Sequence, residues 1–410
     1  MNQTKNQTIK YSVLLILVLG TIIGLTWVNF QFSSQNPGGN DFLARWNGAH
    51  EWLINGNNPY SNQVSEVAQR MIYGRLANAS NGEDIAHFVY PLYSMIFFAP
   101  FALMDYTLAR AVWMTVLELT LIALTVVSIQ LTGRKFKPAI LGGILLFSLL
   151  WYPSIRTIIL GQFSGINALL MLTALLCIKN DKDKLAGFLL ALSTSKPQMS
   201  YLLVVFVIIW AIRSSRQRIW LSFLISMGVM IGGGWLLLPG WPIDWLRQLI
   251  NYPGYTERIG SIVSILAGIT PGIQVTLGKG LLAVFYLYLL FEWVRTRGND
   301  VPTFLWTAYI TLVITNFVAY RTATPHYVAL IAPLFLISRV LTERWGKFGK
   351  GLTWVLYFVF FIGLWALFLL TISGNEEQAI MYVPVPVIIM IGLWWIRWWA
   401  VRPPTRLIEY

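Results

Sequence analysis

Long apolar runs, rather than an alternation of apolar and polar positions, organise most of this chain. Residues 13–30 and 352–371 contain no charged residue, and residues 383–400 contain only Arg397. Each run is long enough to cross the hydrocarbon core of a bilayer, which takes about 17–25 residues. Such segments must be helices because lipid offers the backbone no hydrogen-bond partner, and the short alternating strands of a membrane barrel are absent from the sequence. The pattern predicts an all-α polytopic membrane protein.

The positions of the basic residues predict on which side of the membrane each loop lies. Short loops rich in Lys and Arg stay on the cytoplasmic side, and one threading places at least two such residues in every inner loop. It predicts about 12 transmembrane helices in one domain, residues 1–410, with both termini cytoplasmic and the protein in the cell membrane. The expected crossings are residues 11–30, 109–131, 138–153, 164–178, 185–195, 199–212, 219–238, 278–294, 302–318, 327–341, 352–372 and 382–400.

Composition supports this interpretation. The chain is 56% apolar and 11% charged, whereas soluble domains carry about a quarter charged residues. The net charge of +13 follows from the inner loops. It does not indicate nucleic-acid binding, because no basic stretch on a soluble face is interleaved with base-stacking aromatic residues. Cys177 is the single cysteine, which excludes an internal disulfide framework.

The first outer segment, residues 31–108, is long enough to hold structure of its own. Residues 41–54 form an amphipathic pattern typical of a helix lying along the membrane surface, and residues 62–79 carry apolar positions at helical spacing. The stretch 88–104 is apolar but short and interrupted by prolines, so we expect it to be re-entrant or interfacial. The alternative is that it crosses fully, with a second added crossing near 262–275.

Short polar motifs occur on the expected outer side of the membrane. They are Asn40-Asp41, Gly56-Asn57-Asn58-Pro59-Tyr60, Tyr90-Pro91-Leu92, Gly161-Gln162 with Asn167, Ser195-Lys196-Pro197, and Pro325-His326-Tyr327 with Pro333. In this order they resemble glycosyltransferase family 87, whose members are polyprenol-phosphate-mannose-dependent mannosyltransferases and their relatives, with the multi-spanning glycosyltransferase C (GT-C) architecture. Residues 340–410 show no motif of this kind.

The resemblance implies an inverting glycosyltransferase. It would move a hexose, with mannose the expected sugar, from a polyprenyl-phosphate-sugar donor to a lipid-linked or glycolipid acceptor at the extracytoplasmic face. A transporter or lipid flippase is the first alternative, but that class shows internal repeats and paired broken helices. This sequence has one convincing helix break, at Lys196-Pro197. A non-catalytic scaffold subunit is the second alternative.

Asp41 is the expected catalytic base. The resemblance assigns this role to an aspartate at the start of the first outer loop, and sugar transfer to an alcohol needs one base on the acceptor hydroxyl. The alternative is an N-cap, a common role for Asp at the start of a helix. We expect Glu51 and Glu66, further along the same loop, to lie on solvated helix faces.

A departing lipid phosphate needs cations beside it, and four basic residues on the outer side are candidates: Lys196, His326, Arg321 and Arg156. Lys196 interrupts an apolar segment, where a charge is costly; the alternative is snorkelling to the interface. Arg156 is equally compatible with a headgroup anchor. For His326, the resemblance carries the assignment.

The expected sugar and acceptor pocket consists of Tyr60, Gln162, Asn167 and Tyr90. Gln162 and Asn167 are equally compatible with hydrogen bonds between helices. His50 and His87 are expected to be anchors or satisfied side chains. The three histidines lack metal-ligand spacing and no paired carboxylates lie outside, so we expect a metal-independent reaction without a cofactor.

Overall fold

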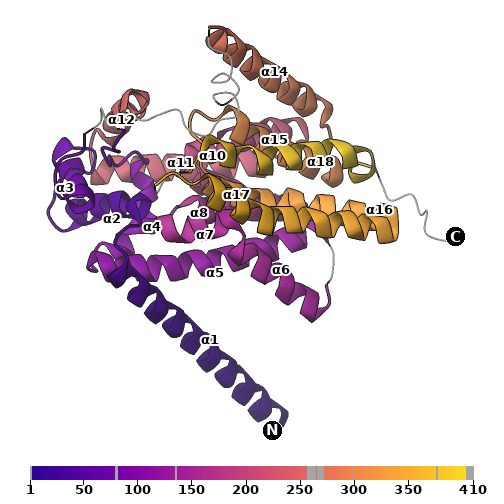
Figure 1. Cartoon of the computed structure of the whole chain (residues 1–410), viewed down its shortest axis with the longest axis horizontal. Coiled ribbons are helices and arrows are strands. Elements are labelled where there is room, and N and C mark those ends of the chain that lie inside the picture. Colours follow the sequence, from indigo (N-terminus) through magenta and orange to yellow (C-terminus); the bar gives the residue numbers. More distant parts are fainter. Residues whose placement is uncertain are drawn as a thin grey trace. The chain divides into compact units, whose positions relative to one another are not determined.

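The structure is a computed structural model of the 410-residue chain. It describes residues 2–78, 82–133, 136–255, 265, 272–298, 300–374 and 377–402. Over these ranges every regular element is a helix, as the sequence predicts (Figure 1). The helices fall into two compact units: residues 1–88, 95–119 and 158–162 form unit 1, and residues 89–94, 120–157 and 163–410 form unit 2.

Unit 1 contains the long segment between α1 and α5, which the sequence analysis places outside. Its elements are α1 (Asn2–Gln35), α2 (Asn40–Leu53), α3 (Asn62–Tyr73), α4 (Met95–Phe98), η3 (Ala99–Phe101), the first part of α5 (Tyr106–Thr132) and the end of α7 (Tyr152–Leu160).

Unit 2 contains the remaining helices. They are η2 (Leu92–Ser94), α6 (Pro138–Leu150), α8 (Ser164–Lys179), α9 (Asp183–Ser193), α10 (Pro197–Arg213), α11 (Gln217–Leu237), α12 (Trp241–Tyr255), α14 (Gln274–Arg295), α15 (Val301–Val318), η4 (Thr324–Leu330), α16 (Ile331–Phe358), η5 (Val359–Gly363), α17 (Leu364–Thr371), η6 (Ala379–Tyr382) and α18 (Pro384–Ala400).

Within the described ranges, seven helices are long and apolar enough to cross a membrane, or eight if the bent pair α6–α7 counts as one span. The chain is therefore a multi-pass membrane protein. The expected number of twelve is not confirmed, because three of the expected crossings form the shorter helices α8, α9 and α10. The apolar helix at Leu92–Phe101 is also short of the length that a full crossing needs. Most of 262–275 lies outside the described residues.

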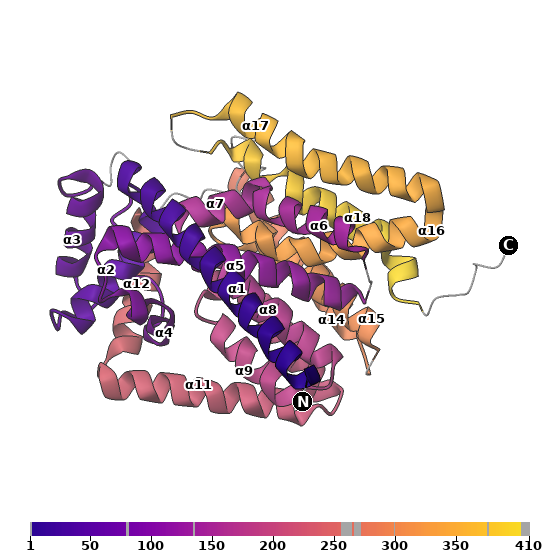
Figure 2. The ribbon, with the colours of Figure 1, turned by 90° about the horizontal axis from the view of Figure 1, so that it is seen from below.

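The longest apolar stretch, Thr324–Thr371, folds back on itself. Gly346 has non-helical angles, φ 52° and ψ −119°, inside α16. The hydroxyls of Ser338 and Tyr357 are 3.4 Å apart across this bend, whereas a straight helix would separate them by about 28 Å. Figure 2 shows the two arms of α16 side by side. The reversal falls where the sequence predicts a loop between residues 341 and 352.

Polar contacts connect α1 to α5 inside unit 1. The Asn29 amide donates to the Glu118 carboxylate at 3.2 Å and to the Thr115 hydroxyl at 3.0 Å. The rest of α1 makes little contact, since only 6% of its apolar window is buried. Hydrogen bonds between spans therefore contribute to holding this helix, in addition to apolar packing.

The turn between α1 and α2 is held by two side chains of α5. Arg110, which is buried, donates to the carbonyl of Asn36 at 2.6 Å, and the Tyr106 hydroxyl donates to the carbonyl of Gly38, also at 2.6 Å. Gly39 takes a left-handed φ of 72°, and a Cβ there would lie 2.6 Å from the Arg110 Nε. The close approach requires glycine and fixes where α2 begins.

A second close approach fixes the first turn of α2. Gly161 has a φ of +68°, and a Cβ there would lie 2.5 Å from the Cβ of Phe42. Phe42 is fully buried and stacks on Trp113 with ring centroids 4.9 Å apart. The Trp113 indole N–H donates to the Gly161 carbonyl at 2.9 Å. The glycine of the Gly161-Gln162 motif thus lies against the residue that follows Asp41.

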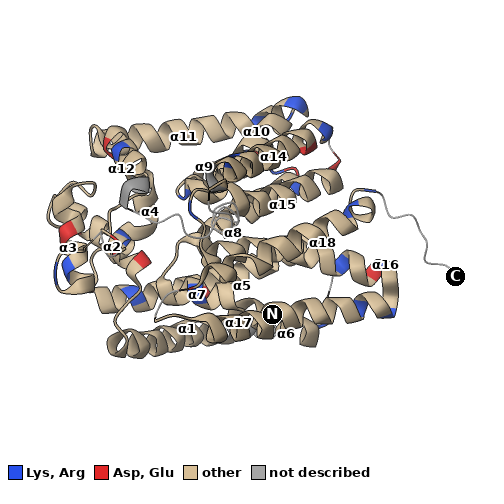
Figure 3. Cartoon of the chain, turned by 45° about the horizontal axis from the view of Figure 1, so that its top comes forward, with Lys and Arg blue, Asp and Glu red and all other residues tan. Residues whose placement is uncertain are grey.

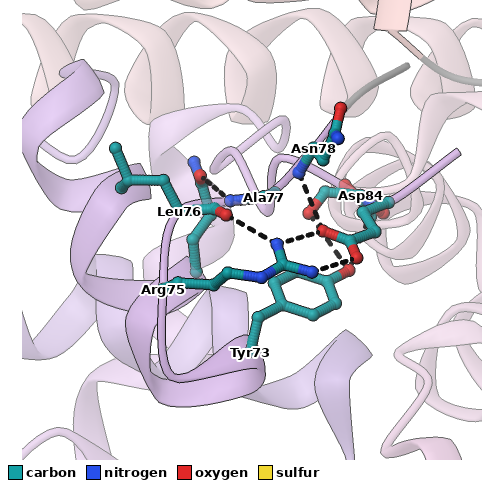
Figure 4. Close-up of polar contacts among 8 residues, drawn as sticks. Tyr73, Arg75, Leu76, Ala77, Asn78 and Asp84 are labelled. Atoms are coloured by element: carbon teal, nitrogen blue, oxygen red, sulfur yellow. Dashed lines mark hydrogen bonds and ion pairs between the residues drawn. The ribbon is translucent and has the colours of Figure 1, made fainter. Parts of the chain in front are cut away.

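The helix after α2 is shorter than the sequence predicts. It ends at Tyr73 rather than 79, because Gly74 caps it in a left-handed conformation with φ 70°. Beyond it, Arg75 pairs with Glu83 through both terminal nitrogens, at 2.8 and 2.7 Å, and Glu83 accepts from the backbone N–H of Asn78 (Figure 4). The Arg75 bonds lower the pKa of Glu83 to about 2. The carboxylate therefore stays ionised as pH falls, until pH approaches about 2.

In unit 2, basic residues gather at one end of the helices and satisfy carbonyls that helix ends leave unpaired. Lys179 donates to two carbonyls at the end of α5, at 2.8 and 2.9 Å. Arg213 donates to two at the end of α14, at 3.2 and 3.1 Å, and Arg216 to one at the end of α8, at 3.0 Å. Figure 3 colours these basic segments blue. Because α8 and α10 both end here, their first residues lie at the opposite end of unit 2.

We predict that Gly161→Ala destabilises the protein by about 2–3 kcal/mol, because the new Cβ meets Phe42 in a conformation that L-residues rarely adopt. The measurement is thermal unfolding of the purified protein in nanodiscs. Gly143→Ala is the matched control, since nothing lies within 4 Å of a Cβ at this position in α6. Equal melting temperatures for the two variants would contradict the packing.

Candidate functional site

Asp41 lies in the first turn of α2 and does not cap it, because the N-cap is Gly39. The N-cap alternative is therefore wrong. Its side chain is 31% exposed and lies 3.8 Å from Arg45, one helical turn on. An ion pair of that length contributes little to stability. The carboxylate is held near a basic group but keeps oxygen lone pairs available for a substrate.

Gln162 is the predicted pocket residue that the fold brings towards Asp41. It follows Gly161, whose backbone touches Phe42, the neighbour of Asp41. Gln162 is buried, as expected of a side chain inside a pocket or between helices. The two motifs, 120 positions apart in the sequence, thus meet inside unit 1 through one glycine and one phenylalanine.

Tyr60 is buried and belongs to the same unit. Its ring packs edge-on against Phe88, with centroids 5.6 Å apart, and its backbone N–H is bonded to the Asn58 side chain at 2.9 Å. Glu51 was expected on a solvated face, which is wrong: it is buried and accepts from the Asn57 side chain at 2.7 Å. A carboxylate therefore ties the Gly-Asn-Asn-Pro-Tyr motif to α2.

Two of the three histidines have structural surroundings. His50 Nδ1 lies 2.8 Å from the carbonyl of Ala102, and its ring stacks on Trp46. Burial lowers the pKa of His87. Among the described residues no group of three or more His, Cys, Asp or Glu side chains is arranged to hold a metal.

Lys196 is the most deeply buried basic residue of unit 2. It is 1% exposed and occupies the N-cap of α10, directly before Pro197 at the helix start. The snorkelling alternative is therefore wrong, because a snorkelling amine would reach water. Burying an ammonium is costly unless other groups interact with it.

His326 and Arg321 share the surroundings of Lys196. His326 lies in η4, is 4% exposed, and is within electrostatic range of both Lys196 and Arg321. The hydroxyl of Thr322 lies 3.5 Å from His326 Nδ1. Three of the four predicted phosphate ligands, drawn from two loops more than a hundred positions apart, are thus close together.

Arg156, the fourth, is paired with a residue that the sequence analysis missed. Its Nε lies 2.7 Å from Glu377 Oε1, and the same oxygen accepts from the hydroxyls of Tyr152 and Thr324 at 2.6 and 2.7 Å. Glu377 lies between α17 and η6, where no motif pointed to it. Its only signal was a carboxylate in a short loop, expected to be outside, of a chain that keeps charge out of its spans.

Asn167 lies in the first turn of α8 and is fully buried. Neither its amide nitrogen nor its oxygen has a hydrogen-bond partner among the described residues, and the same holds for the hydroxyl of Ser164, one turn earlier. The interhelical alternative for Asn167 therefore finds no support in the described part of the chain. Buried polar atoms left in this state suit a polar ligand.

Tyr90 is the last predicted pocket residue and is buried in unit 2. Its ring packs against Phe163, immediately before α8, with centroids 5.9 Å apart. It therefore borders the same helix start as Ser164 and Asn167. Unit 2 thus gathers a basic cluster (Lys196, His326, Arg321, Arg156) and a neutral polar helix start, while unit 1 carries Asp41 with Gln162.

Comparison with known proteins gives one result. The family model for glycosyltransferase family 87 matches residues 88–319, more than half of the chain. No curated protein and no solved structure matches. The matched region includes the motifs around Tyr90, Gly161 and Lys196, three of those on which the resemblance was based. The chain belongs to glycosyltransferase family 87.

Proposed function

We propose that the protein transfers a hexose, with mannose the expected sugar, from a polyprenyl-phosphate-sugar donor to a lipid-linked or glycolipid acceptor, with inversion at the anomeric carbon. The observation that carries the proposal is the basic cluster formed by the buried Lys196 and His326 with the partly buried Arg321, in an apolar helix bundle. Cations held in place before a reaction stabilise the charge that develops on a leaving group. A lipid phosphate is an anion that reaches such a site from the bilayer.

Asp41 is the proposed base. It accepts the proton of the acceptor hydroxyl as that oxygen forms its bond to the anomeric carbon, and the bond from this carbon to the phosphate oxygen breaks on the opposite side. The electron pair leaves with the phosphate. This role needs a carboxylate that is not engaged in capping the helix. The half-buried position of Asp41 in the first turn of α2, with Gly39 as the N-cap, supports it.

The neutral polar groups suit the sugar. Hydroxyl groups donate and accept, as an amide does, so Asn167 has two atoms ready for one ring, and Ser164 has a third. Gln162, Tyr60 and Tyr90 are assigned to the remainder of the sugar and acceptor pocket. The lipid phosphate carries no diphosphate to neutralise, so the proposed reaction uses neither metal nor cofactor.

The proposal includes an orientation. The basic ends of α8, α10 and α14 lie together, and basic loops favour the cytoplasm. This supports an extracytoplasmic site at the other end, both termini in the cytoplasm, and a twelve-crossing GT-C architecture in the cell membrane. The surface helices α2 and α3 are assigned to the outer interface, where they would border the path of the lipid substrates.

A multi-spanning transporter or flippase for the same lipid is the second candidate, since the basic cluster would also suit it. The two candidates differ in the fate of the bond to phosphate. Free polyprenyl phosphate that is released only when an acceptor is present indicates a transferase. Movement of the intact donor across a vesicle membrane, without cleavage, indicates a transporter.

Asp41→Asn should lower transfer by about 10²–10⁴-fold, the usual contribution of a general base, while donor binding remains. The measurement is the initial rate of sugar transfer by purified protein. Glu66→Gln, in the neighbouring helix α3, is the matched control and should retain the wild-type rate. Transfer by Asp41→Asn at the rate of the control would refute the assignment.

Lys196→Gln should weaken binding of the polyprenyl-phosphate sugar by roughly 10- to 100-fold, as expected for loss of a charge-assisted hydrogen bond. Because Lys196 is 1% exposed, the substitution alters a buried position, so the melting temperature of the protein without ligand is measured as well. Binding measured in nanodiscs, beside thermal unfolding, separates the two effects. A fall in both would instead indicate a structural lysine.

Asn167→Leu should raise stability and lower activity together. The isosteric apolar side chain relieves two unpaired buried atoms, which cost about 1–3 kcal/mol, but removes contacts to the sugar. Asn316→Leu is the comparison, because Asn316 is buried with its amide already bonded to the Leu312 carbonyl at 2.9 Å, so this change should destabilise. A destabilised Asn167→Leu protein with full activity would contradict the pocket.

A further inference from the structure

Glu377 is an acidic residue that pairs with Arg156, one of the basic residues of unit 2. Its side chain is 5% exposed. The oxygen Oε1 is shared by Tyr152 and Thr324, which donate to it, and by the Arg156 guanidinium at 2.7 Å. A carboxylate beside an anion-binding site lowers the affinity of that site for anions. We therefore expect this carboxylate to have a role of its own.

Arg156 keeps donors for another anion. Its side chain is 20% exposed, and its Nε–H is not aligned for a hydrogen bond with the Glu377 oxygen, although the two atoms are close. Over the part of the chain that the structure describes, its two terminal nitrogens make no hydrogen bond. Guanidinium groups hold phosphates through such paired nitrogens. Arg156 is therefore in ionic contact with Glu377, while its terminal nitrogens can still bind another anion.

The proposed reaction changes the charge of the phosphate. The donor is a phosphodiester with one negative charge, and the product is a phosphomonoester whose second ionisation has a pKa near 6. A site made of cations alone would bind the doubly charged product more tightly than the donor. Release of the product would then limit turnover.

We propose that Glu377 competes with the lipid phosphate for Arg156 and so weakens binding of the phosphomonoester product relative to the phosphodiester donor. This rests on the proposed function. Glu377 acts through Arg156 and touches no reacting atom, so it is a positioning residue. When a donor binds, Lys196, Arg321, His326 and Arg156 hold the phosphate. Once the product carries a second charge, Glu377 offsets part of its attraction to Arg156.

The test compares two ligands that differ only in phosphate charge. Full-length protein in nanodiscs is titrated at pH 8 with farnesyl phosphate, a monoester, and with farnesyl methyl phosphate, a diester. Glu377→Gln keeps an oxygen for the Tyr152 and Thr324 hydroxyls but removes the charge. It should bind the monoester about tenfold more tightly than wild type does, and the diester at most about threefold more tightly.

Two further variants separate charge competition from a loss of structure. Glu292→Gln is the matched control, because Glu292 is also buried and paired with an arginine, Arg397, at 2.5 Å, in α14 and α18. It should leave the ratio of the two affinities unchanged. The double variant Arg156→Gln with Glu377→Gln should lose the gain, because the effect is transmitted through Arg156.

The outcomes are distinguishable. A ratio that Glu377→Gln leaves at the wild-type value, or that the double variant retains at the raised value, overturns the role of Glu377 and leaves the glycosyltransferase proposal intact. Wild-type protein that binds neither farnesyl ligand overturns the proposed donor class and this inference with it. A raised ratio in Glu377→Gln alone supports the proposal.

Discussion

Burial of charge inside an apolar helix bundle is the constraint on which this structure depends. Lipid cannot hydrate an ammonium or a guanidinium, so a chain that places Lys196 and Arg156 at the ends of its spans must pair them or supply an anion. Arg156 is paired with Glu377, and the buried Lys196 is within electrostatic range of His326, which is also within range of Arg321. In the proposed function, this concentration of positive charge favours a negatively charged ligand.

The two ends of the unit 2 helices differ in the contacts that their polar residues make. At one end, Lys179, Arg213 and Arg216 donate to the last carbonyls of neighbouring helices, so their charge stabilises the fold. At the other end, the helix starts of α8 and α10 carry polar groups that the protein itself leaves underused, with Asn167 as the clearest case. In the proposed function, the stabilising basic residues and the substrate-binding groups therefore lie at opposite ends of these helices.

Much of the fold was predictable, because apolar runs and the order of motifs can be recognised in the sequence without knowledge of packing. The all-helical fold, a helix beginning near Asn40, and the reversal near Gly346 were of this kind. Glu51 and Glu377 were not. A carboxylate in a polar loop resembles any solvated one, and burial depends on partners such as Asn57 or Tyr152 that only the folded chain brings near. The count of twelve crossings is not confirmed, because α8, α9 and α10 are shorter than the other candidate spans.

The attachment of α1 bears on how the protein is made. The groups that bind the Asn29 amide of α1, Glu118 and Thr115, belong to α5 and are translated later, after residues 36–105. Until α5 is made, the Asn29 amide lacks these acceptors. Docking of α1 through Asn29 therefore follows the synthesis of α5.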